Sequence, residues 1–153
     1  MDPTTFRTCT VADMEGAPNL AELFAEYAQE SALEDLGEPI VQVETYRQME
    51  AAGVLHMIGA FQGPHLVGFL VLIVSVVPHF GRLIASTESL FISKPARRGG
   101  AGMRLLQLAE EVATECGAVG LFVSAPVGSR LEGVMGGKKA YRNTNSLFFR
   151  SLT

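Results

Sequence analysis

Residues 97–102 (RRGGAG) combine groups that bind anions. Two arginines and three glycines fall between Arg97 and Gly102, immediately before a helical pattern. The first N–H groups of a helix lack partners within it, and the helix dipole places positive charge there. Glycines let the backbone close around a ligand, and arginines add charge and fork-shaped donors. The stretch predicts a phosphate site, the alternative being a glycine-rich turn whose arginines face solvent.

This stretch fits neither of two common phosphate-binding motifs. A Walker loop needs Gly-Lys-Ser/Thr, and a dinucleotide fingerprint needs G-x-G-x-x-G with an acidic residue at a later strand end. The sequence has neither pattern here. A plain α/β protein that binds a nucleotide such as ATP through its phosphates stays open as an interpretation.

Composition limits the class of protein. The chain has 153 residues, 48% hydrophobic and 18% charged, which predicts one domain over residues 1–153 with a substantial core. A net charge of −4 gives no support for a nucleic-acid partner. Cys9 and Cys116 fit neither a disulfide framework nor a metal spacing, so no metal is expected.

The sequence shows no membrane or export signal. Its first ten residues, MDPTTFRTCT, lack a basic region followed by an apolar run. The longest apolar stretch, Leu66–Val77, has twelve residues, whereas a membrane-spanning helix takes roughly 20. Because it is rich in β-branched residues, it predicts a buried strand. We therefore expect a soluble, cytoplasmic protein without a membrane partner.

Hydrophobic periodicity and breakers predict a mixed sheet with helices packed on it, of the α/β (α+β) class. The segment from Leu83 to Ser124 has the length of a parallel βαβ crossover, and an antiparallel hairpin precedes it. The expected strands are 5–11, 55–61, 66–77, 83–93, 119–124 and 145–152. The expected helices are 17–29, 43–52 and 100–116, with a short one possible within 128–137.

The stretch Arg97–Gly102 resembles motif A of the GNAT superfamily, the acetyl-CoA-dependent N-acetyltransferases. That motif reads Arg/Gln-x-x-Gly-x-Gly/Ala at the start of the central helix, and the six residues match it in full. Glu88–Pro95 is similar to the family's fourth strand and its lead-in, and the element order agrees over roughly residues 5–150. Residues 141–145 and 148–150 resemble small GNAT-like proteins common in bacteriophage genomes. The resemblance implies a mostly antiparallel central sheet with a parallel strand pair splayed at a cofactor cleft.

The resemblance also implies acetyl-CoA as cofactor. It assigns the pantetheine arm to the backbone of Leu90, Phe91 and Ile92, where an N–H would also polarise the thioester carbonyl. It assigns the pyrophosphate to the amides of Arg97, Arg98, Gly99, Gly100, Ala101 and Gly102. The two arginine side chains would reach the phosphates of the adenosine half.

A general base and a substrate contact follow from the same resemblance. Many members place a glutamate four residues before the position of Ile92, which here is Glu88. Burial near a cleft would raise the pKa of such a carboxyl towards the useful range, whereas the alternative is a solvent-facing strand residue. His79 lies in the turn where the acceptor enters this fold. It is either a substrate contact or a polar turn residue.

The general acid departs from the family pattern. Members often carry a tyrosine in the fourth helix that protonates the departing thiolate, and its position here falls on Gly136. Tyr141 is a possible substitute, or else a core tyrosine. Residues 133–139 are poor helix formers because an interior glycine costs about 1 kcal/mol relative to alanine.

These observations predict an acetyl-CoA-dependent N-acetyltransferase that acts on a primary amine of an unknown acceptor. The alternative is a catalytically inactive GNAT-fold module that binds CoA or a protein partner, including one associated with a virion. A monomer or a homodimer is expected, the latter through the strand that holds Phe148 and Phe149.

Overall fold

The computed structural model describes residues 2–153 and divides the chain into two compact units, one ending at Phe122 and one of Val123–Thr153. The first unit holds a five-stranded sheet of order β1-β2-β3-β4-β5. The strands are β1 Thr4–Cys9, β2 Leu55–Gln62, β3 His65–Val77, β4 Arg82–Ile92 and β5 Leu121–Phe122. Its helices are α1 Val11–Glu15, α2 Leu20–Ser31, α3 Val43–Ala51, the 3-10 turn η1 Lys94–Ala96 and α4 Ala101–Glu115. Among residues 2–153, no helix has the length and apolar character needed to cross a membrane.

The sheet is antiparallel except at one edge. β1 to β4 pair antiparallel in sequence, and β5 joins β4 in parallel through Ala85 with Leu121 and Ser86 with Phe122. This confirms the mixed sheet and the βαβ crossover, although β5 has two residues where six were expected. Residues 87–92 of β4 therefore extend beyond the last pair with β5.

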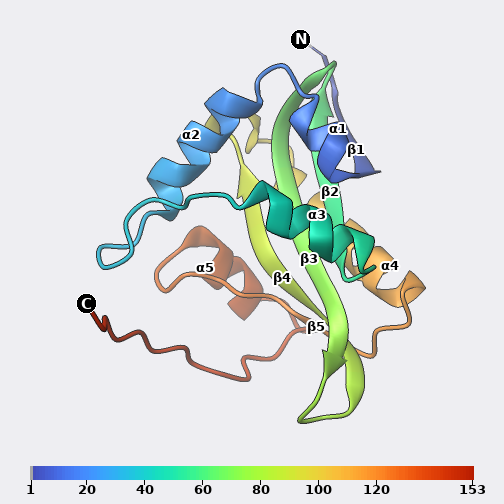
Figure 1. Ribbon diagram of the computed structural model, residues 1–153, viewed down its shortest axis with the longest axis vertical. Helices are drawn as coiled ribbons and strands as arrows, with labels where there is room; N and C mark the ends of the chain where they lie inside the picture. The colour runs from blue at the N-terminus through green and yellow to red at the C-terminus, as the bar shows by residue number, and fades with distance from the viewer. Residues whose placement is uncertain (1) are drawn as a thin grey trace. The chain divides into compact units, whose positions relative to one another are not determined.

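Helices cover both faces of the sheet. Figure 1 shows α1, α2 and α3 in front of the strands and α4 behind them. The α4 side buries Leu70 and Leu72 against Leu105, and the other side buries Phe69 and Phe91 with residues of α1 and α2. Because β3 is covered on both faces, its sequence is a continuous apolar run rather than an alternating one.

Two N-terminal boundaries differ from expectation. The helix expected at 17–29 begins at Leu20, because the side chain of Asn19 is bound to β3: its Nδ2 donates to the Leu66 carbonyl (2.7 Å) and its Oδ1 accepts from the Leu66 N–H (2.9 Å). The expected first strand ends at Cys9, because Thr10 begins α1 with a reciprocal capping box to Asp13. With five residues, α1 is too short for periodicity to reveal.

The Val123–Thr153 unit contains α5 (Arg130–Gly136), which confirms the short helix predicted within 128–137. The Ser129 side chain accepts from the Glu132 N–H (3.2 Å), and this cap opposes the cost of the interior glycines. The strand expected at 145–152 is wrong, because no part of it is paired within residues 2–153. Its apolar residues suggested a strand, but Leu147 and Phe148 are 94% and 91% exposed.

Gly68 on β3 marks a close approach between β3 and the end of β4. A Cβ at Gly68 would lie 2.5 Å from Ile92 Cδ1 and 2.9 Å from the Phe91 carbonyl oxygen. We predict that Gly68→Ala lowers the free energy of unfolding by about 1–3 kcal/mol, the range for overpacking, measured by urea denaturation. Gly102→Ala is the control, because its Cβ meets nothing within 4 Å, and it should leave stability unchanged or raised. Equal stability of Gly68→Ala and wild type would contradict this packing.

Candidate acyl-transfer site

The turn before α4 adopts a conformation that glycine favours. Gly99 and Gly100 have φ of +86° and +78°, and Gly100 is the N-cap of α4. Cβ atoms on Gly99, Gly100 and Gly102 would meet no described atom within 4 Å. The first helical bond runs from the Arg104 N–H to the Gly100 carbonyl (3.0 Å), so the preceding amides form the donor-rich end of the helix. The sequence thus builds an open, electropositive backbone turn that suits a phosphate.

Two carboxylates of α2 hold the connection that leads into this turn. Glu26 accepts from the Ser93 hydroxyl through Oε1 (2.9 Å) and from the Lys94 N–H through Oε2 (3.3 Å). One helical turn further on, Glu30 forms an ion pair with Arg97. Sequence reasoning missed both glutamates, although their spacing of four residues on one helix was a usable signal that they share a face.

The two arginines of the motif have different environments. Arg97 is half-buried, donates from Nε to the Ile92 carbonyl (2.8 Å), pairs with Glu30 and lies 5.7 Å from the centre of the Phe91 ring. Arg98 is exposed and has no hydrogen bond or ion pair to any of residues 2–153. Arg97 therefore fixes the connection, whereas the charge of Arg98 is available to a ligand.

A β-bulge places Glu88. Val71 of β3 pairs with Ser89 and Leu72 pairs with Thr87, so Glu88 is the extra residue of β4. Its Oε1 accepts from the Tyr46 hydroxyl (2.7 Å) and its Oε2 from the Ser89 hydroxyl (2.9 Å). Glu88 is exposed, so the burial expected for it is wrong, because the bulge takes it out of the strand's alternation. The carboxylate of Glu88 is therefore hydrogen-bonded by two hydroxyl groups rather than surrounded by apolar side chains.

An apolar cavity of about 70 Å³ lies beside Glu88, between the sheet and α1–α3. Tyr46 and Ser89, the two partners of Glu88, both line it. The pKa of Tyr46 is raised mainly by burial and, to a smaller extent, by its hydrogen bond to Glu88. The pKa of Tyr27 is raised first by burial and then by the Glu88 charge. Both phenols therefore stay protonated at neutral pH and act as donors towards the carboxylate or a ligand.

The other predicted site residues lie in several places. The side chains of Phe91 and Ile92 are buried and that of Leu90 is half-buried, which leaves the backbone as the part a ligand can contact. His79 is exposed at the tip of the β3–β4 hairpin, with its ring against Phe80. From Arg82, where β4 begins, to Glu88 is roughly 20 Å along the strand, so the structure does not bring His79 to Glu88. Tyr141 is half-buried in the Val123–Thr153 unit, and its N–H donates to the Lys138 carbonyl (3.1 Å).

No three His, Cys, Asp or Glu side chains within residues 2–153 are grouped as a metal site would require.

The sequence matches the model of the Acetyltransferase (GNAT) family over residues 18–129, which is more than half of the chain. The chain belongs to this family. Members of the GNAT family use acetyl-CoA. The comparison with curated proteins found no match.

Solved structures of other acetyltransferases share the fold of this GNAT chain. One is a ribosomal-protein-alanine N-acetyltransferase from Brucella melitensis biovar Abortus 2308 (19% identity, 97% of this chain and 99% of that chain, TM-score 0.71). Another is an aminoglycoside acetyltransferase from an uncultured soil metagenomic sample, in complex with sisomicin (18%, 98% and 97%, 0.74). A third is an aminoglycoside N-acetyltransferase in complex with CoA (12%, 100% and 97%, 0.72). At these identities the likeness shows the fold.

The role of Glu26 is testable against a neighbour on the same helix. Glu26→Ala removes the acceptor for Ser93 and Lys94, so we predict a free energy of unfolding about 1–2 kcal/mol below that of Glu22→Ala. Both changes replace glutamate by alanine on α2, and no hydrogen bond or ion pair joins Glu22 to residues 2–153. Because Glu22 lies in the first turn, its loss also removes a helix-dipole contribution of about 0.3–1 kcal/mol, which reduces the predicted difference rather than creating it. Urea denaturation measures the difference, and hydrogen exchange should speed up at the Lys94 amide. Equal stability and unchanged exchange would show that Glu26 does not hold the connection.

Proposed function

We propose that this GNAT-family chain is an acetyl-CoA-dependent N-acetyltransferase that acetylates a primary amine. The observation that carries the proposal is the left-handed Gly99–Gly100 turn, which opens over the amides at the start of α4. The proposed setting is the cytoplasm, in keeping with two free cysteines, Cys9 and Cys116.

The proposed cofactor contacts follow from what the turn and β4 leave available. The amides of residues 98–102 would hold the pyrophosphate, since the Arg97 N–H already donates to the Lys94 carbonyl (3.3 Å), and Arg98 would add its unpaired charge. Arg97 would act by keeping the turn in place, since its guanidinium is already bound to Ile92 and Glu30. The backbone of residues 90–92 lies beyond the last β4–β5 pair and would bind the pantetheine arm.

Glu88 is the proposed general base. Acetyl-CoA, when bound, supplies the thioester carbonyl that the amine attacks. Glu88 takes a proton from the amine as the C–N bond forms, while Tyr46 and Ser89 hold the two carboxylate oxygens in place. A backbone N–H at the end of β4 would stabilise the oxyanion. Tyr141 is the proposed donor of a proton to the departing thiolate.

A second function is favoured by the C-terminal segment. Leu147, Phe148 and Leu152 are 94%, 91% and 88% exposed, which is unusual for large apolar side chains. Such a segment suits an inactive GNAT-fold module that binds a protein partner, including the virion-associated kind suggested by the phage-like C-terminal stretch. Turnover separates the two functions, since the module requires none.

The cofactor site is tested by two changes at one position. Acetyl-CoA should raise the melting temperature of the wild type and ATP should not, because a ligand that binds the native state stabilises it. Gly102→Ala should keep this shift, because the motif allows alanine there, whereas Gly102→Glu should abolish it by placing a negative charge in the turn. A thermal-shift assay measures both. A shift that survives Gly102→Glu would place the cofactor elsewhere.

The base is tested by transfer to an amine. Glu88→Gln keeps an acceptor for Tyr46 but cannot take a proton, so we predict a kcat about 100-fold lower, within the range for a lost general base. The thermal shift with acetyl-CoA should be unchanged. Glu111→Gln is the control, because Glu111 is exposed on α4, which covers the other face of the sheet (Figure 1), and no hydrogen bond or ion pair joins its side chain to residues 2–153. Wild-type kcat in Glu88→Gln at every pH would show that another group takes the proton.

A further inference from the structure

We propose that the acceptor is a small monoamine with a short apolar body, held with its carbon chain in the cavity and its amino group at Glu88. This inference rests on the proposed N-acetyltransferase function and adds the substrate class.

The wall of the cavity is mostly apolar, and it includes one charged side chain, that of Glu15. Aromatic and aliphatic side chains form most of it, among them Phe24, Phe69 and Val71. The carboxylate of Glu15, which also lines the cavity, is bound by Arg47. The remaining polar groups of the wall include the neutral side chains of Tyr27, Tyr46 and Ser89. A hydrocarbon chain gains from this surface, whereas a second ammonium group would lose its water there for a carboxylate that Arg47 already binds, which is costly.

Glu88 does not itself line the cavity, but it supplies a charge next to two residues that do, Tyr46 and Ser89. Its two oxygens accept one hydrogen bond each from residues that line the cavity, and the carboxylate is itself exposed. A carboxylate has about four acceptor positions, so it can also bind an amine. An amino group at Glu88 thus places the next carbons of the ligand beside Tyr46 and Ser89, at the cavity wall.

The volume limits the length of the apolar body. The cavity measures about 70 Å³, roughly half of the ~150 Å³ cavity that holds a benzene ring. On that scale, a chain of about three to four carbon atoms fills the cavity, which is open to solvent on one side. This favours a short alkylamine over a bulky polycation, even though some proteins that share the fold are aminoglycoside acetyltransferases.

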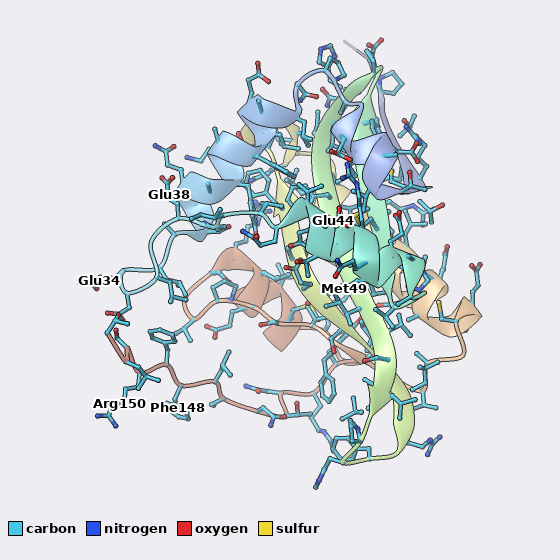
Figure 2. The ribbon with its side chains drawn as sticks, in the orientation of Figure 1. Glu34, Glu38, Glu44, Met49, Phe148 and Arg150 are labelled. Carbon is cyan, nitrogen blue, oxygen red and sulfur yellow. The ribbon has the colours of Figure 1, made fainter. Side chains whose placement is uncertain are left out.

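The connection between α2 and α3 is acidic and would favour a polycation over a monoamine. It carries Glu34, Asp35 and Glu38, which would attract a polycation. Figure 2 shows Glu34 and Glu38 on this connection, directed away from the sheet, and none of the three lines the cavity. The connection contributes Val41 to the cavity wall instead. The cavity, rather than these acids, is therefore expected to select the acceptor.

A matched pair of amines tests the proposal on the full chain. n-Butylamine and 1,4-diaminobutane have the same carbon chain, and the second differs by an ammonium group at the far end. With acetyl-CoA saturating, release of the CoA thiol gives kcat/KM for each amine and for sisomicin. We expect n-butylamine to exceed both others at least 10-fold. Val41→Asp should shrink or reverse the preference over 1,4-diaminobutane, because it places a carboxylate in the wall.

Ile40→Asp is the control for that variant. It adds the same charge one residue away, at a side chain that is 83% exposed and does not line the cavity, so the preference should remain. Transfer to 1,4-diaminobutane or sisomicin at an equal or higher kcat/KM would overturn this inference and leave the acetyltransferase proposal standing. Acetyl-CoA binding without transfer to n-butylamine would also overturn it. Failure to bind acetyl-CoA at all, seen by thermal shift, would overturn both proposals.

Discussion

The hold of α2 on the β4–α4 connection is the interaction on which the rest of the site depends. Glu26 fixes Ser93 and Lys94, and Glu30 fixes Arg97, whose Nε is bound to the end of β4. The side chains of the Arg97–Glu30 pair are 33% and 38% exposed, so solvent screens it and its own contribution is about 1 kcal/mol or less. Its importance is geometric, because it sets where the Gly99–Gly100 turn opens.

The same helix also lines the cavity proposed for the acceptor. Tyr27 lies between Glu26 and Glu30 in sequence, and its ring packs against Phe69 and Phe91 with centroids 5.3 and 5.5 Å apart. Side chains of one helix thus form part of the cavity wall and hold the connection into the turn proposed for phosphate. The bulge at Glu88 completes the arrangement, since one extra residue brings a carboxylate to two hydroxyls of the cavity wall.

The sequence could reveal those features of the site that are built from residues close together along the chain. The Gly/Arg turn, α4 and the crossover to β5 follow from neighbouring residues, so motif and periodicity predict them. The bulge leaves no local signal, because a strand with one extra residue reads like any other strand. Tyr46 meets Glu88 across 42 residues and Glu26 meets Ser93 across 67, separations at which one sequence carries no pairing information. The strand predicted at residues 145–152 was wrong for a related reason, because a strand-like composition does not by itself provide a neighbouring strand to pair with.

The most direct test of the central claim is a titration of the ¹⁵N-labelled chain with CoA, followed by backbone amide chemical shifts. If the turn held by α2 is the pyrophosphate site, the amides of Gly99, Gly100 and Gly102 should move most, and those of Thr114 and Glu115 at the far end of α4 should stay in place. ATP should cause smaller changes at the same concentration. Shifts concentrated away from residues 97–102, or equal responses to CoA and ATP, would contradict the account.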